Sequence, residues 1–126
     1  MEPRLEAIGL GYLASPYSKY PGGLERAFIE ASRIAGKLIE KGMRVYSPIA
    51  HCHPISMYAG LDPLNLPLWL DVDEAMMAKA DALIVAHMTG WQESSGIAHE
   101  VAFFEKAGKP IYDLVLPGLE MARRTT

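Results

Sequence analysis

The chain has 126 residues but only one cysteine, Cys52, and no long apolar run. A single cysteine cannot form an internal disulfide, which is typical of a protein from a reducing cytoplasm. No stretch approaches the roughly 18 consecutive apolar residues of a membrane span. The N-terminus also lacks a charged segment followed by an apolar core, so we expect neither a membrane contact nor a signal peptide.

Basic residues are not in excess, since the chain has 12 Lys and Arg against 15 Asp and Glu, and its formal net charge is -3. A protein that binds duplex nucleic acid normally carries a basic patch, so this class of partner is not expected. Gly9-Leu10-Gly11 has no third glycine of a dinucleotide fingerprint, and Gly22-Gly23 lacks the Gly-Lys-Ser/Thr of a phosphate-binding loop. The sequence therefore predicts no cofactor of these two kinds.

The histidines offer a weak metal pattern in His51-Cys52-His53. On an extended segment, alternate side chains point to opposite sides, so these two histidines are poorly placed for one ion. No second pair of Cys or His stands at a ligand spacing. We therefore expect no metal site, and at most a single histidine in the wall of a pocket.

What the sequence does have is a regular alternation of short apolar runs and amphipathic segments. The predicted strands are residues 7–14, 43–47, 82–86 and 109–114, and the predicted helices are 24–41, 67–79 and 95–107. Residues 48–66, with three prolines, read as a long loop, and 119–126 as a frayed turn. This order predicts one domain over 1–126 with an α/β fold: a three-layer, flavodoxin-like or Rossmann-like arrangement around a parallel sheet of four or five strands.

In such a sheet the ligand lies beyond the carboxyl ends of the strands. The segments 15–23, 47–53 and 87–96 should converge there. The last of them ends in Ser94-Ser95-Gly96, whose small residues leave backbone N–H groups accessible at a helix start. Glu100 follows about one turn later, where the helix dipole favours its ionised form, and is a candidate nucleophile. An exposed surface glutamate is the alternative.

Asp73 is the second candidate, because Leu70, Met76 and Met77 share its side of the predicted helix. A carboxyl beside an apolar stripe would have a raised pKa, which suits it to donate a proton. The alternative is a solvated residue at the edge of the stripe. The aromatic residues Tyr12, Tyr17 and Trp91 could stack on a base, or could belong to the core.

Together these features resemble the nucleoside 2-deoxyribosyltransferase superfamily, and within it a small bacterial and phage branch. The superfamily also includes 2′-deoxynucleoside 5′-monophosphate N-glycosidases. Tyr12-Leu13-Ala14-Ser15-Pro16 is similar to the family's first strand, and Asp73 stands eight residues before the aspartate of Ala80-Asp81, as in the family pattern. Gly96 and Glu100 match the loop glycine and the nucleophile. The resemblance spans residues 8 to about 114.

The resemblance implies that Glu100 attacks the sugar and that Asp73 assists proton transfer to the base. It places the substrate beside Tyr12, Ser15, Pro16, Tyr17, Trp91, Ser94, Ser95 and Gly96. Ser15, Ala98 and Ala102 stand where the family usually has glycine. Ser94, six residues before Glu100, matches the serine of the monophosphate glycosidases, whereas the nucleoside transferases have an acidic residue there.

The expected function is N-glycosidic bond cleavage or deoxyribosyl transfer on a nucleoside or nucleoside 5′-monophosphate, by a cytoplasmic homodimer or higher homo-oligomer. A non-catalytic nucleotide-binding or sensing module with the same pocket is the first alternative. A scaffold that uses the apolar segment between Leu61 and Leu70 as an interface is the second.

Overall fold

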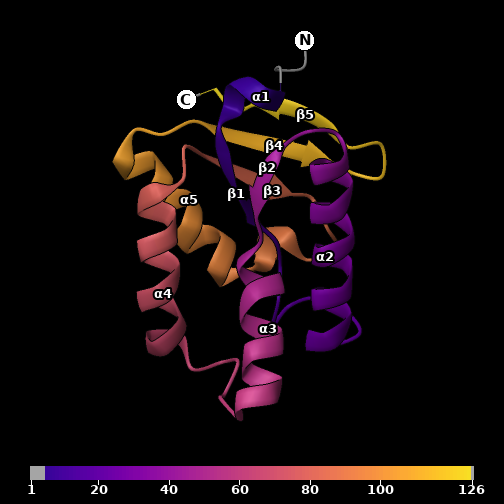
Figure 1. Ribbon diagram of the computed structural model, residues 1–126, viewed down its shortest axis with the longest axis vertical. Coiled ribbons are helices and arrows are strands. Elements are labelled where there is room, and N and C mark those ends of the chain that lie inside the picture. Colours follow the sequence, from indigo (N-terminus) through magenta and orange to yellow (C-terminus); the bar gives the residue numbers. More distant parts are fainter. Residues whose placement is uncertain (1–4, 126) are drawn as a thin grey trace.

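A five-stranded sheet lies at the centre of the computed structural model, which describes residues 5–125 (Figure 1). The strands are β1 (Leu10–Ala14), β2 (Arg44–Tyr46), β3 (Ala82–Ala86), β4 (Ile111–Val115) and β5 (Glu120–Arg123). Their order in the sheet is β2-β1-β3-β4-β5. The first four strands are parallel, and β5 pairs antiparallel with β4. The α/β class and the mostly parallel sheet were thus both predictable.

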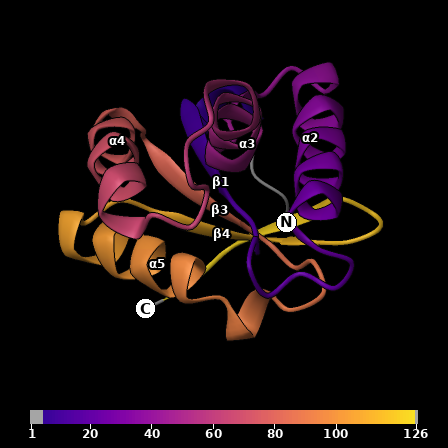
Figure 2. The same cartoon turned by 90° about the horizontal axis from the view of Figure 1, so that it is seen from below.

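Helices flank this sheet, as Figure 2 shows from below. They are α1 (Leu5–Ile8), α2 (Leu24–Glu40), α3 (Pro48–Ala59), α4 (Leu66–Lys79) and α5 (Ser95–Ala107), with a short 3-10 helix η1 (Trp91–Glu93) before α5. α2 packs on one face of the sheet and α4 and α5 on the other. α3 lies beside α2. No helix within residues 5–125 has the length and apolar character needed to cross a membrane.

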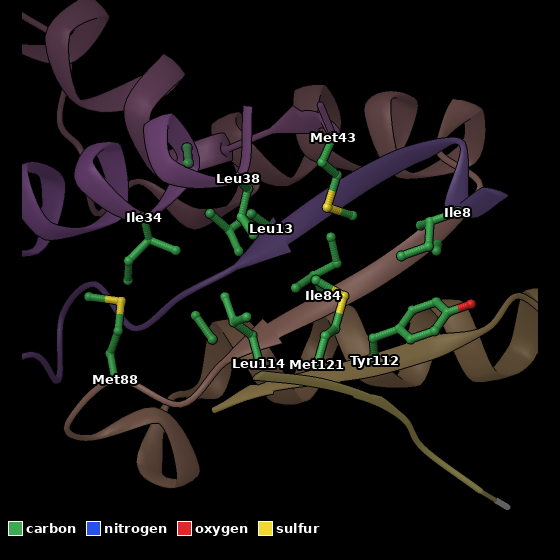
Figure 3. Packing of buried hydrophobic residues seen from close by; sticks show 13 residues of the cluster. Ile8, Leu13, Ile34, Leu38, Met43, Ile84, Met88, Tyr112, Leu114 and Met121 are labelled. Atoms are coloured by element: carbon green, nitrogen blue, oxygen red, sulfur yellow. The ribbon is translucent and has the colours of Figure 1, made fainter. Parts of the chain in front are cut away.

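The core has two halves because side chains alternate between the faces of each strand. Leu13, Ile84 and Leu114 point toward α2 and meet Ile34 and Leu38 there (Figure 3). On the opposite face, strand residues pack against α4 and α5. This second group consists of Tyr12, Ala14, Met77, Ala80, Leu83, Val85, Ile97, Phe104 and Ile111. The central strand β3 is buried along its whole length, which explains its continuous apolar sequence.

The prediction of a loop over residues 48–66 is wrong, since residues 48–59 form α3. Ser47 caps this helix by accepting a hydrogen bond from the Ala50 N–H at 3.2 Å, and Pro48 occupies the first turn, where a missing N–H costs nothing. Gly60 ends the helix in the left-handed conformation, with φ of 70°. Pro54 lies inside the helix and is tolerated there.

The tail was also predicted wrongly, because residues 120–123 form strand β5 rather than a frayed turn. At the other end, the first strand begins at Leu10, and residues 5–8 are helical. Gly9 separates the two with a φ of 79°. The Asp81 carboxylate accepts a hydrogen bond from the Leu10 N–H at 2.8 Å, which fixes the start of β1 against the start of β3.

Candidate active site

A cavity of about 340 Å³ opens at the carboxyl ends of β1 and β3. This is the point where the chain leaves the central strands in opposite directions, and in α/β sheets ligands bind there. Its polar side is formed by the segment after β1, with Ser15, Tyr17 and Ser18, and by the start of α5. Its apolar side comes from α3 and α4 and the segment between them. These apolar residues are Pro48, Ile49, Cys52, Pro63, Leu64, Leu66 and Trp69.

Both candidate carboxyls line this cavity: Asp73 from α4 and Glu100 from α5. Burial raises the pKa of Asp73 to about 6, and the charge of His99 opposes that rise. Burial also raises the pKa of Glu100 to about 8, and the neighbouring Asp73 carboxylate raises it further. The helix dipole was expected to favour ionised Glu100. It does not prevail, because desolvation and repulsion from Asp73 are stronger.

Polar groups without partners surround these carboxyls. Among the described residues, Asp73 Oδ1 and the hydroxyls of Tyr12 and Tyr46 are buried and make no hydrogen bond of standard geometry. The Tyr12 hydroxyl is nevertheless close enough to Glu100 to lower the pKa of that carboxyl. Buried polar atoms normally have partners, and of the unsatisfied ones Asp73 Oδ1 and Ser15 Oγ belong to residues of the cavity lining, so a ligand or water there could satisfy them.

The start of α5 supplies the expected anion- or hydroxyl-binding group. Ser94 is the N-cap and its Oγ accepts a hydrogen bond from the Ile97 N–H at 3.2 Å, which still leaves its own O–H free to donate. The N–H groups of Ser95 and Gly96 belong to the first helical turn, where no carbonyl of the same helix can accept from them. Ser94, Ser95 and Gly96 all line the cavity.

Tyr17 lines the cavity and is held by a histidine that does not. Its hydroxyl lies 2.6 Å from Nδ1 of His53, which is buried on α3 and stacks on Phe28 with ring centroids 4.7 Å apart. The sequence predicted a histidine in the pocket wall. His53 instead lies behind the wall and holds Tyr17, which does line the cavity. His51, by contrast, is exposed, and His51-Cys52-His53 is helical rather than extended.

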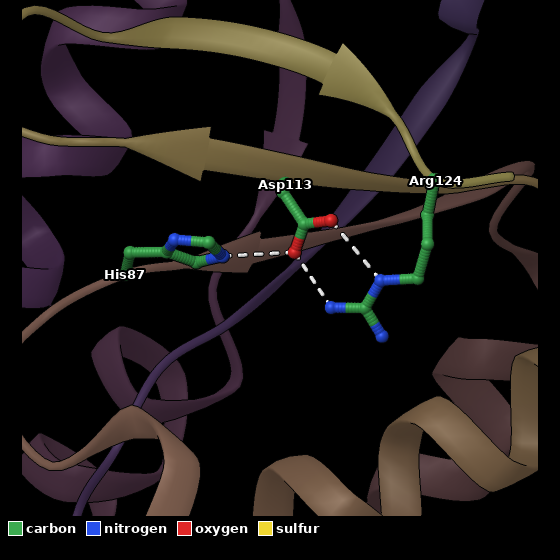
Figure 4. Close-up of polar contacts among 3 residues, drawn as sticks. All are labelled: His87, Asp113 and Arg124. Atoms are coloured by element: carbon green, nitrogen blue, oxygen red, sulfur yellow. Dashed lines mark hydrogen bonds and ion pairs between the residues drawn. The ribbon is translucent and has the colours of Figure 1, made fainter.

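Tyr12, Pro16 and Trp91 do not line the cavity. Tyr12 and Pro16 are fully buried, and Trp91 stacks on His87 with ring centroids 4.0 Å apart. His87 in turn lies 2.8 Å from an Asp113 oxygen, and Arg124 donates two hydrogen bonds to the same carboxylate (Figure 4). Trp91 therefore anchors the segment between β3 and α5 rather than facing a base.

Burial alone would raise the pKa of Asp113, but the hydrogen bonds from Arg124 and His87 outweigh it and lower the pKa. This cluster joins β3, β4 and the residue after β5, so it holds the carboxyl end of β3 in place. None of its three residues lines the cavity.

Sequence reasoning missed the helical wall formed by Ile49 and Cys52. The signal was present in Ser47-Pro48, a capping residue followed by proline at a first helical turn, and in Gly60 at the end. Burial raises the pKa of the Cys52 thiol to about 12, so this cysteine behaves as a neutral wall residue.

A larger hollow of about 730 Å³ lies at the opposite edge of the sheet, between Gly108 and Ile111 and around Arg123 and Arg124. It lacks the convergent unsatisfied groups of the first cavity. Lys109, its other basic residue, is engaged with the carbonyls of Met77, Ala78 and Ala80 at the end of α4. The smaller cavity therefore remains the candidate site.

Residues 9–115 match the model of a protein family described as a domain of unknown function, DUF1937. The chain belongs to this family. The matched segment runs from the start of β1 to the end of β4 and so includes every residue of the candidate site. No curated protein matches the chain.

The raised pKa values predict a stability that depends on pH. A carboxyl whose pKa is higher in the folded state holds its proton longer than in the unfolded chain, so stability falls as pH rises from about 4 to about 8. Glu100→Gln removes the charge that must be buried, and we expect this variant to gain stability relative to the unmodified chain between pH 5 and pH 8. Urea unfolding at both pH values measures the difference.

The exposed Glu93→Gln serves as the matched control and should show no such trend. A constant difference between Glu100→Gln and the unmodified chain over this pH range would contradict the burial of the Glu100 carboxyl.

Proposed function

We propose that this protein cleaves the N-glycosidic bond of a nucleoside or nucleoside 5′-monophosphate, by hydrolysis or by transfer of the deoxyribosyl group to another base. The observation that carries the proposal is that two carboxyls from different helices, Asp73 and Glu100, line one cavity, close enough for the charge of Asp73 to raise the pKa of Glu100. Paired carboxyls of this kind perform retaining glycosidic chemistry.

In the proposed reaction, the Glu100 carboxylate attacks the anomeric carbon while the bond from that carbon to the base nitrogen breaks. The electron pair of the broken bond goes to the base, and Asp73 delivers a proton to it. Water or a second base then attacks the anomeric carbon, gives its proton to the Asp73 carboxylate and releases Glu100 as a carboxylate. The transition state resembles an oxocarbenium ion, which the negative charge of Glu100 stabilises.

Near neutral pH the pair holds the number of protons that this reaction needs. Between about pH 6 and pH 8 the two carboxyls hold one proton between them, and in the free protein it lies mainly on Glu100, whose pKa is the higher. The reaction needs that proton on Asp73 and the charge on Glu100, so it proceeds from the less populated of the two singly protonated forms. The Tyr12 hydroxyl, which lowers the pKa of Glu100, favours this arrangement, and the departing base draws the proton from Asp73.

The fold supports the same proposal. The order β2-β1-β3-β4-β5 matches that of flavodoxin-like sheets except that β5 is antiparallel, and we infer a three-layer Rossmann-like arrangement with its ligand at the junction of β1 and β3. The cavity's apolar wall suits a base and its polar rim a sugar. We also infer a cytoplasmic location, supported by the single, buried Cys52.

The proposal predicts release of free base from a panel of nucleosides and 5′-monophosphates, measured by chromatography. The rate should be bell-shaped in pH, falling below about 6, where both carboxyls are protonated, and above about 8, where neither is. Glu100→Gln should abolish release, and Asp73→Asn should slow it by about a hundredfold or more. Unchanged turnover in Glu100→Gln would remove the mechanism.

Glu93→Gln again serves as the control. If members of the panel raise the melting temperature but no base appears, the protein is the non-catalytic binding module instead. That result would leave the cavity as a nucleotide site without chemistry.

A second prediction concerns the 5′ end of the substrate. We expect Ser94 and the free N–H groups of Ser95 and Gly96 to bind it, since they are the donors on the cavity's polar side. Ser94→Asp keeps a good N-cap but adds a negative charge. It should therefore raise KM for monophosphates far more than for nucleosides. An equal effect on both substrates would place the 5′ end elsewhere.

We also propose that the protein is a homodimer whose interface includes the ends of α3 and α4. Exposed apolar side chains gather there, beside the cavity mouth: Met57, Tyr58, Leu61, Leu64, Leu66 and Leu68. Leu64 and Leu66 also line the cavity, so a second copy packed on this surface would cover its mouth. Tyr58, which is 93% exposed, should be covered in the dimer.

Sedimentation velocity tests this assembly. The unmodified chain should sediment as a dimer, and Tyr58→Glu combined with Leu61→Glu should sediment as a folded monomer. A monomer in the unmodified chain, or a dimer in the double variant, would contradict the proposed interface.

A further inference from the structure

A contact between a histidine and a glutamate links α4 to α5 next to the two cavity carboxyls. His99 Nε2 lies 3.0 Å from Glu74 Oε2. Glu74 follows Asp73 on α4, and His99 precedes Glu100 on α5. Consecutive helix residues point about 100° apart. The carboxyls of Asp73 and Glu100 therefore face the cavity, while Glu74 and His99 meet beside it, outside its lining.

Few contacts hold α4 in place, so the Glu74–His99 contact matters for the position of this helix. Of the residues in α4, only Trp69 and Met77 are buried. Lys109 holds the far end of the helix through three carbonyls, but it lies beyond the turn that carries Asp73. Glu74–His99 is thus the polar contact that fixes the middle of α4 against α5.

The pair also acts on Asp73 through charge. In its protonated form His99 attracts the Asp73 carboxylate, and this lowers the pKa of Asp73 against the effect of burial. Titratable groups on three other elements also face the acid pair. They are Tyr12 from β1, Tyr46 from β2 and Cys52 from α3. None of these three can carry a positive charge, whereas His99 can.

We propose that the Glu74–His99 pair is a positioning device for the proposed reaction: it holds α4 against α5 so that Asp73 and Glu100 face one cavity, and it places the imidazole of His99, which is a cation when protonated, beside Asp73. The part of this proposal that concerns catalysis rests on the proposed function. The part that concerns the proton affinity of Asp73 does not, because it can be measured in the free protein.

The test is a carbon-13 NMR titration of the side-chain carboxyls, with Asp73→Asn and Glu100→Gln used to assign the signals. His99→Gln keeps a hydrogen-bonding side chain without the charge, and should move the Asp73 titration upward by about half a pH unit or more, a modest shift because the pair is partly exposed and water screens it. His99→Lys restores the charge and should move it back.

Lys106→Gln removes one positive charge from an exposed position on the same helix and should leave the Asp73 titration unchanged. An unchanged titration in His99→Gln, or an equal shift in Lys106→Gln, would overturn the proposal. The proposal would also be overturned if His99→Lys did not move the Asp73 titration back toward that of the unmodified chain.

The pH profile of base release separates this proposal from the proposed function. If base is released, its acidic limb should move to higher pH in His99→Gln together with the titration. If no base is released but the titration moves as expected, the proposed function fails and the charge role of His99 stands.

Discussion

Two partly buried carboxyls that line one cavity impose the main constraint on this molecule. Burial disfavours the ionised form of each, and the charge of Asp73 further raises the cost of ionising Glu100. Nothing in the core requires them, because Met77 and Phe104 already pack the two helices against the sheet. The chain keeps Asp73 and Glu100 in a cavity at the sheet edge at a cost to its own stability. Such a cost is typical of sites whose chemistry needs a proton held in an unusual place.

The surrounding structure can be understood from that constraint. The Asp113 cluster holds the carboxyl end of β3, Ser94 fixes the first turn of α5, and His53 holds Tyr17 over the cavity. These contacts come from separate parts of the chain, yet all act on the three segments that enclose the acid pair. The cavity is therefore rigid on its polar side, where a sugar would lie, and depends on α4 for its apolar side.

Much of this was predictable from sequence, since β3 and α5 have clear patterns with good boundaries and the two acids follow directly from them. The sequence did not reveal α3, because prolines at 48 and 54 and the His-Cys-His run are typical of a loop. Packing beside α2 stabilises this helix, and the local sequence does not show that contact. Strand β5 was missed because Glu120 to Arg123 has little strand preference and forms only because β4 offers an unpaired edge. The sequence also did not show that Trp91 stacks on His87 instead of lining the cavity, because no rule of residue spacing predicts this contact.

The short outer strands have a consequence for how copies of this chain can meet. At one border β2 has three residues, and at the other β5 has four with charged residues at both ends. Neither offers a long, flat row of free backbone groups on which a foreign strand could grow, so edge-to-edge aggregation is disfavoured. The dimer proposed above uses helical surfaces instead, where side chains rather than backbone groups select the partner.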